Sequence, residues 1–154
     1  DGDYHHGDGT EHFFYDDPSV LFFSTHDWNA YPGTGDPSRR GTGYGNGFNI
    51  NVHLPCGSNN LDIENAFLNY LKPKALNFAP DFVLISAGFD SRKNDLLGCF
   101  SIDDYGYRNI TKITSEIANL SAGGRIISIL EGGYNPSGVA SSVSAHVEEL
   151  ILTI

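Results

Sequence analysis

Methionine is absent from this 154-residue sequence, and cysteine and basic residues are scarce. The two cysteines, Cys56 and Cys99, are too few and too scattered for a disulfide framework or a CxxC metal site, so we expect a reducing, intracellular compartment, either nucleus or cytoplasm. Only 9 Lys and Arg stand against 19 Asp and Glu, which disfavours direct nucleic-acid binding and favours cationic partners such as lysine-rich tails or polyamines. No apolar run approaches the roughly 20 residues of a membrane span, and no signal-peptide pattern is present, so we expect no membrane association.

Large apolar side chains are nevertheless plentiful enough to build a core. Hydrophobic residues make up 40% of the sequence, with 10 Phe and 8 Tyr, and the length corresponds to one domain. Because the sequence has no Met and opens at Asp1 inside a dense polar motif, we expect it to be an internal piece of a longer protein.

Apolar runs and alternation predict the strands. Continuous apolar runs at 20–25, 82–86 and 126–130 indicate strands buried on both faces. Residues 48–54 alternate strictly between apolar and polar side chains, which predicts a strand with one buried, apolar face. The glycine-rich stretch 27–47 between them is typical of a long functional loop.

Capping residues and helical spacing predict the helices. We expect a short helical turn capped by Thr10, and a helix over 61–78 that Pro73 kinks or ends. A third helix should begin after a Ser101 cap and stop at Gly123-Gly124, and a last one should begin at Pro136 behind an Asn135 cap. Strands that alternate with amphipathic helices predict an α/β domain with a mainly parallel sheet.

Unusual polar residues follow the predicted strands, at the edge where α/β proteins bind ligands. In extended backbone, Asp3 and His5 point to the same face, and Asp90 follows the strand 82–86. Three such nitrogen and oxygen donors are the protein ligands of a catalytic zinc site. Taken alone, an Asp-x-His pattern such as Asp3 and His5 is more often an ordinary polar turn than a metal site, and Asp90 alone is more often a cap than a ligand.

Several motifs in order resemble the zinc-dependent histone deacetylase superfamily, which includes acetoin-utilisation proteins and acetylpolyamine amidohydrolases. The opening DGDYHHGDGT is similar to its metal-binding segment D-x-D-x-H-H-G-[ND]-G-T, SAGFD at 86–90 to its S-A-G-F-D, and LEGGYN at 130–135 to its L-E-G-G-Y-N. The shorter matches are DPSV at 17–20, Ser24-x-His26 and PGTG at 32–35, and the wording is closest to class II-like members. The resemblance implies an arginase–deacetylase-like fold, incomplete at the N-terminus, with residues 1–154 as the C-terminal part of one catalytic domain.

The resemblance also implies a reaction and a role for each matching residue. It implies removal of acetyl groups from Nε-acetyl-lysine of histones or other proteins, and hence chromatin regulation. Asp3, His5 and Asp90 would hold Zn²⁺, and Tyr134 would donate its hydroxyl to the developing oxyanion. The implied acyl-lysine channel is lined by Tyr31, Leu97, Gly132 and Gly133. A structural K⁺ would be bound by Asp1, Asp3, His5, Ser24 and Thr25, and the residues implied to orient the catalytic groups are Asp1, Asp8 and His6.

Two departures from the family pattern qualify this expectation. The general acid/base of the family is a His-His pair upstream, which this sequence does not contain, so we expect the chain alone to be inactive or a poor catalyst and a longer parent to be active. Residues 94–96 read Asn-Asp-Leu where Gly-Asp-Pro is common, which bears on substrate choice because that loop borders the channel.

Three alternatives stay open. The same hydrolysis could act on acetylated polyamines or other small amides. The chain could be a non-catalytic module that binds acyl-lysine. Asp1-x-Asp3 could hold Mg²⁺ for phosphate chemistry, although the imidazole of His5 favours zinc.

Overall fold

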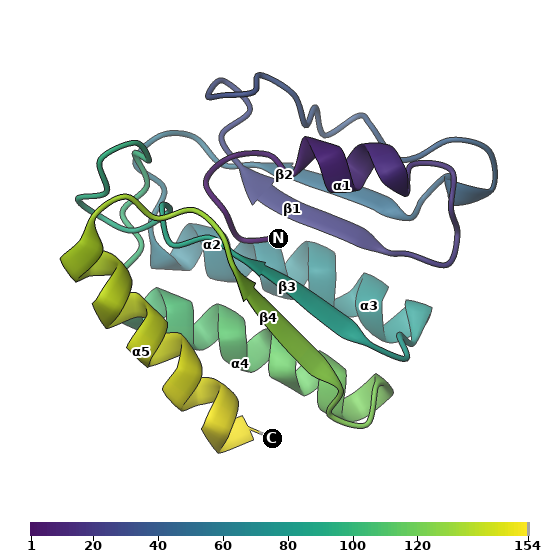
Figure 1. The fold of residues 1–154 in the computed structure, drawn as a ribbon. Helices are drawn as coiled ribbons and strands as arrows, with labels where there is room; N and C mark the ends of the chain where they lie inside the picture. Colours follow the sequence, from purple (N-terminus) through teal and green to yellow (C-terminus); the bar gives the residue numbers. More distant parts are fainter. Residues whose placement is uncertain (154) are drawn as a thin grey trace.

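Four parallel-paired strands and their connecting helices make up the chain, as a computed structural model that describes residues 1–153 shows (Figure 1). The strands are β1 (Phe22–His26), β2 (Asn49–His53), β3 (Val83–Ala87) and β4 (Ile126–Leu130). β1 pairs with β2 and β3 pairs with β4, both in parallel. The helices are α1 (Asp8–Phe13), α2 (Asn60–Ala66), α3 (Lys72–Phe78), α4 (Asp104–Ser121) and α5 (Pro136–Thr153), with a 3₁₀ turn at Gly43–Gly45. The predicted α/β class with parallel strands is confirmed.

The opening segment lies between the two strand pairs. The Thr25 amide donates to the Asp1 carbonyl at 3.2 Å, which attaches the segment to β1. The Gly2 amide donates to the Ser86 carbonyl at 3.3 Å, which attaches the same segment to β3. Figure 1 shows the N-terminus in this position, between β1 and β3. Residues 3–5 therefore emerge between the carboxyl ends of two strands.

The predicted helix 61–78 is present but interrupted. Asn59 caps α2 with a reciprocal capping box that includes Asp62, and a π-helical turn, Phe67–Leu71, separates α2 from α3. Pro73 lies at the start of α3 and lacks the N–H that a regular helix would use, so the wider turn absorbs the irregularity. At the expected kink, the chain therefore changes from α-helix to a π-helical turn and back to α-helix.

Two predicted caps are wrong. Asp103, rather than Ser101, caps α4, because its carboxylate accepts from the amides of Tyr105 and Gly106. The helix α1 begins after Gly7, so Thr10 lies within it. The Asn135 cap of α5 is confirmed by a bond from the Gly138 amide to its side-chain oxygen at 3.2 Å.

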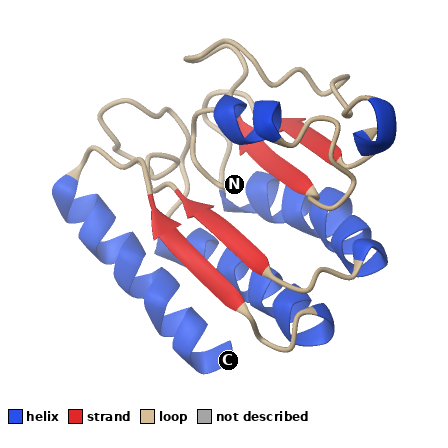
Figure 2. Cartoon of the chain, turned by 45° about the vertical axis from the view of Figure 1, so that its right-hand side comes forward, coloured by secondary structure: helices blue, strands red, loops and turns tan. Residues whose placement is uncertain are grey.

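The predicted burial is correct for β1 and for the apolar side of β2, and it is wrong for the polar side of β2 and for one face of β3 and β4. On β3 and β4, Leu84 is 66% exposed and Ile129 is 55% exposed, because α4 lies behind these strands and no described element covers their front (Figure 2). On β2 the polar side chains Asn49 and Asn51 are buried, because both donate to the buried carboxylate of Glu11 on α1. The helix α1 thus covers the polar side of β2, which the alternation of apolar and polar residues had predicted to face solvent.

The two cysteines are joined in a disulfide, which the sequence spacing did not predict. Their Cα atoms lie 5.2 Å apart although 43 positions separate them in the sequence, because the loops that follow β2 and Asp90 lie side by side. Among residues 1–153 no helix combines the length and the apolar character that crossing a membrane requires.

Candidate metal centre

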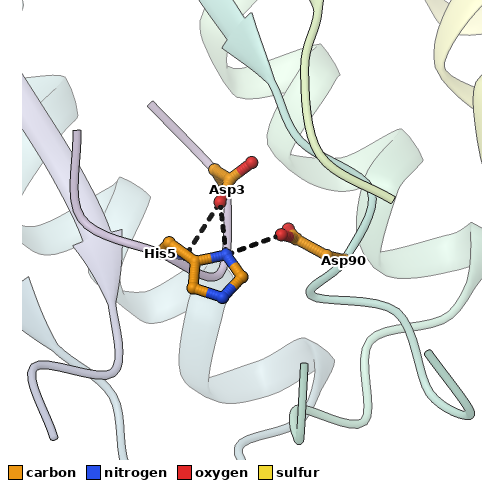
Figure 3. A group of neighbouring side chains, drawn as sticks. All are labelled: Asp3, His5 and Asp90. Carbon is orange, nitrogen blue, oxygen red and sulfur yellow. Dashed lines mark hydrogen bonds and ion pairs between the residues drawn. The ribbon is translucent and has the colours of Figure 1, made fainter. Parts of the chain in front are cut away.

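Asp3, His5 and Asp90 converge at the carboxyl edge of the strands (Figure 3). One ligand atom from each of the three side chains lies within 4.8 Å of the others. The Nδ1 atom of His5 faces both carboxylates, at 3.2 Å from an Asp3 oxygen and 2.9 Å from an Asp90 oxygen. One imidazole nitrogen and two carboxylates form a donor set that suits a zinc ion with a further position open.

Backbone donors hold each carboxylate in place. The His5 amide donates to Asp3 Oδ1 at 2.8 Å, and the Gly132 amide donates to Asp3 Oδ2 at 3.1 Å. The Tyr4 amide donates to Asp90 Oδ1 at 2.8 Å. Because these donors belong to backbone in fixed segments, the carboxylates are oriented before any ion arrives.

The cluster carries negative charge in a buried place. The side chain of Asp90 is fully buried, and burial followed by the nearby charge of Asp3 raises the pKa of Asp90 to about 7. Two ionised carboxylates that are this close together and this well shielded from water destabilise the fold unless a positive charge lies between them. The electrostatics therefore favour a bound cation.

Glycines allow the backbone to approach the carboxylates. A Cβ atom on Gly132 would lie 2.5 Å from one oxygen each of Asp3 and Asp90. A Cβ atom on Gly88 would lie 2.3 Å from an oxygen of Asp3. Any side chain at these two positions would displace the proposed ligands.

A pocket of about 630 Å³ opens over the cluster and contains most of the predicted channel residues. Tyr31, Leu97, Gly132 and Tyr134 line it. The rings of Tyr31 and Tyr134 lie edge-on to the His5 ring, with centroids 6.4 and 6.5 Å away. Gly133 is not one of the lining residues, and a Cβ there would meet Val139 at 2.6 Å.

Asp95 is a residue whose importance the sequence reasoning missed. Its Oδ2 accepts from the amides of Tyr134 at 2.8 Å and Asn135 at 3.2 Å, and its Oδ1 accepts from Leu97 at 2.9 Å and Gly98 at 3.1 Å. Burial raises the pKa of Asp95, but these four amides outweigh it, so that the pKa falls below its usual value. The sequence signal for Asp95 is the Asn-Asp-Leu departure at residues 94–96, which predicted an effect on substrate choice only.

The residues implied for a monovalent cation lie on adjacent backbone. Asp1 is hydrogen-bonded to Thr25 through its carbonyl and to the Asp3 amide through its side chain, at 3.1 Å. The Ser24 hydroxyl bonds to Nδ1 of His26 at 2.9 Å, so it is already engaged. The Thr25 hydroxyl is buried without a partner among the described residues.

The other two predicted orienting residues are His6, which also lines the pocket over the cluster, and Asp8, which does not. His6 is buried, with its ring nitrogens 2.8 Å from the Thr34 hydroxyl and 3.2 Å from Glu11. Asp8 is exposed and lines a second pocket, of about 560 Å³, together with His6.

Comparisons with known proteins identify the family. The profile of the histone deacetylase domain matches residues 1–150. Histone deacetylase 15 of Arabidopsis thaliana is 39% identical over 98% of this chain and 27% of its own length, and the human polyamine deacetylase HDAC10 is 38% identical over 98% and 23%. The crystal structure of the HDA15 HD domain superposes with a TM-score of 0.91 at 39% identity, over 98% of this chain and 43% of that one. The chain thus spans about a quarter of the length of these curated relatives, and it belongs to the histone deacetylase family.

Proposed function

We propose that this chain carries the metal centre of a zinc-dependent amidohydrolase that removes acetyl groups from Nε-acetyl-lysine of histones or other proteins. The observation that carries the proposal is the convergence of Asp3, His5 and Asp90 beneath a pocket edged by Tyr134, in a member of the histone deacetylase family. Under this proposal, residues 1–154 are the C-terminal part of a single catalytic domain.

Each residue of the centre has a defined task. Asp3, His5 and Asp90 would hold Zn²⁺, which when bound polarises an amide carbonyl and makes water more acidic. Tyr134 would donate its hydroxyl to the carbonyl oxygen as negative charge develops there. The pKa of Tyr134 is raised, mainly by partial burial and then by the charge of Asp90, which keeps the phenol protonated as a donor.

The pocket wall suits an acyl-lysine side chain. Tyr31 and Leu97 are 82% and 60% exposed, and they present apolar surface beside the metal centre. Such surface would pack against the methylene stem of lysine while the acetyl group faces the ligands. Gly132 adds room, because its missing side chain leaves the floor of the pocket open.

The nearby polar residues would support the centre. A structural K⁺ bound by Asp1, Asp3, His5, Ser24 and Thr25 would neutralise and orient the carboxylates. Asp1, Asp8 and His6 would orient catalytic groups, including an upstream base. Because this chain spans about a quarter of the length of its curated relatives, we propose that it is a poor catalyst alone and that a longer parent works in the nucleus or cytoplasm, on chromatin or other acetylated proteins.

Deacetylation of polyamines is the second candidate. Its support is the human relative that is named a polyamine deacetylase. The net charge of −10 favours cationic substrates of either kind. Turnover of an acetyl-lysine peptide and of acetylspermidine by the parent protein separates the two, because the favoured substrate should have the higher kcat/KM.

Metal analysis of the chain tests the centre itself. We expect one zinc per chain, lost in Asp90→Asn and retained in the exposed control Asp81→Asn. In the parent, Tyr134→Phe should lower kcat by about 100- to 1000-fold while peptide binding persists. A parent that binds acetyl-lysine peptides but shows no turnover to lose would be a binding module, and a chain that binds Mg²⁺ in preference to zinc would refute the zinc centre.

A further inference from the structure

We propose that Cys56 and Cys99 form a reversible thiol–disulfide pair, a covalent modification site addressed by low-molecular-weight disulfides such as oxidised glutathione. The pair joins the loop after β2 to the loop after Asp90. Disulfides in reducing compartments are usually transient and redox-sensing, so the regulatory role inferred for this pair rests on the proposed location in the nucleus or cytoplasm.

The two thiols are brought together by backbone contacts that do not depend on the sulfur–sulfur bond. The Gly57 amide donates to the Cys99 carbonyl at 2.9 Å, and the Ser101 amide donates to the Ser58 carbonyl at 2.7 Å. The Cα atoms of the cysteines are 5.2 Å apart, within the usual range for a disulfide. The reduced protein therefore keeps both thiols in position to react again.

Exposure assigns a different role to each cysteine. Cys56 is exposed, whereas Cys99 is half-buried with its Sγ 3.2 Å from the Tyr4 hydroxyl. In the oxidation, the Cys56 thiolate attacks one sulfur of oxidised glutathione and releases one glutathione as thiolate. The Cys99 thiolate then attacks the Cys56 sulfur and releases the second glutathione. The two cysteines lose two protons and two electrons, and one glutathione disulfide becomes two thiols.

The bond acts on a loop that borders the candidate metal centre. Gly98 precedes Cys99, and a Cβ on Gly98 would lie 1.8 Å from the Asp90 carbonyl, so the loop packs directly on a proposed ligand residue. Leu97 and Asp95 lie in the same loop, and Asp95 holds the Tyr134 backbone. The bond adds a covalent constraint to the backbone contacts of this segment, so residues 95–101 should open less often in the oxidised protein than in the reduced protein.

The test uses this chain equilibrated with either reduced or oxidised glutathione, followed by alkylation and mass spectrometry. With oxidised glutathione we expect a mass lower by two hydrogens and no alkylation, and with reduced glutathione two alkylated thiols. The thermal midpoint of the oxidised chain should be higher by about 10 °C, because the bond closes a long loop. Hydrogen exchange of the amides in 97–101 should slow on oxidation by more than that of the amides in β1.

Cys56→Ser is the matched control, because it keeps the loop and removes the attacking sulfur. Its thermal midpoint should not respond to oxidised glutathione by more than a small fraction of the shift in the unaltered chain. Two glutathione adducts on the unaltered chain, free thiols under oxidising conditions, or an equal shift in Cys56→Ser would each overturn the proposal. These readouts need neither zinc nor turnover, so they are independent of the proposed hydrolase function.

Discussion

Replacing Asp90 with Asn should stabilise the chain in a chelator while abolishing its response to zinc. The exchange removes one charge from a fully buried side chain and keeps an oxygen that can accept from the Tyr4 amide. Burial and the charge of Asp3 raise the pKa of Asp90 from 3.8 to about 7. A raised pKa means that the folded chain binds more protons than the unfolded chain between these two values. The free energy of unfolding therefore falls as pH rises through that window and stays lower above it.

The magnitude follows from the size of the shift. At about 1.4 kcal/mol per pKa unit, a shift of about 3 units costs at most about 4 kcal/mol above pH 7. Asp90→Asn does not carry this cost, so at pH 8 in a chelator it should be more stable than the unaltered chain by up to about 4 kcal/mol. Near pH 4 the carboxyl of Asp90 is neutral in the fold, and the two proteins should be nearly equal.

Zinc offsets this difference. An ion at 1,000 times its dissociation constant stabilises the unaltered chain by about 4.1 kcal/mol, which equals the largest expected advantage of the variant, whereas the variant has lost a ligand and should gain little. Urea unfolding followed by the fluorescence of Trp28, at pH 4.5 and pH 8, with chelator or with zinc, measures all four conditions. Asp81→Asn is the control, since its carboxylate is exposed. A variant less stable than the unaltered chain at pH 8 in chelator, or a difference that is the same at both pH values, would refute the reasoning.

Three further predictions concern the pocket floor, the core and a buried histidine. Gly132→Ala places a methyl group 2.5 Å from two ligand oxygens and should weaken zinc binding by about 10- to 100-fold, measured by competition with a chromophoric chelator. Ile102→Ala, at a side chain with no exposure, should lower the free energy of urea unfolding by about 2–5 kcal/mol, whereas Leu61→Ala at 64% exposure should cost far less. Burial lowers the pKa of His146, so the fold favours its neutral form and the free energy of unfolding should fall as pH drops below 6.5; His146→Gln should flatten that slope, and an unchanged slope would contradict the assignment.

The parts of the fold that repeat locally were predictable from the sequence. Apolar runs marked the strands, and the Asn135–Pro136 pair marked the start of α5. The short Asp3-x-His5 spacing predicted that both side chains lie on one face. The rule that ligand sites form at the carboxyl ends of parallel strands predicted that Asp90 lies beside them. These inferences depend on period, cap chemistry and the direction of parallel strands, which a single sequence contains.

Contacts between distant segments were not predictable in the same way. The buried polar face of β2 exists because Glu11, about 40 residues earlier, supplies a carboxylate that accepts from Asn51. The Cys56–Cys99 bond and the four amides around Asp95 arise where loops meet, and no local pattern encodes such a meeting. Exposure of Leu84 depends on which neighbour covers a sheet face, a property that hydrophobicity alone does not contain.

The opening segment ties the two strand pairs together, because its backbone bonds to β1 on one side and to β3 on the other. Asp3 lies in that opening segment, and Asp90 lies in the loop that follows β3. An ion bound by both carboxylates would therefore also connect the two strand pairs. Removal of such an ion would then weaken the connection between the two strand pairs as well as empty the candidate metal centre.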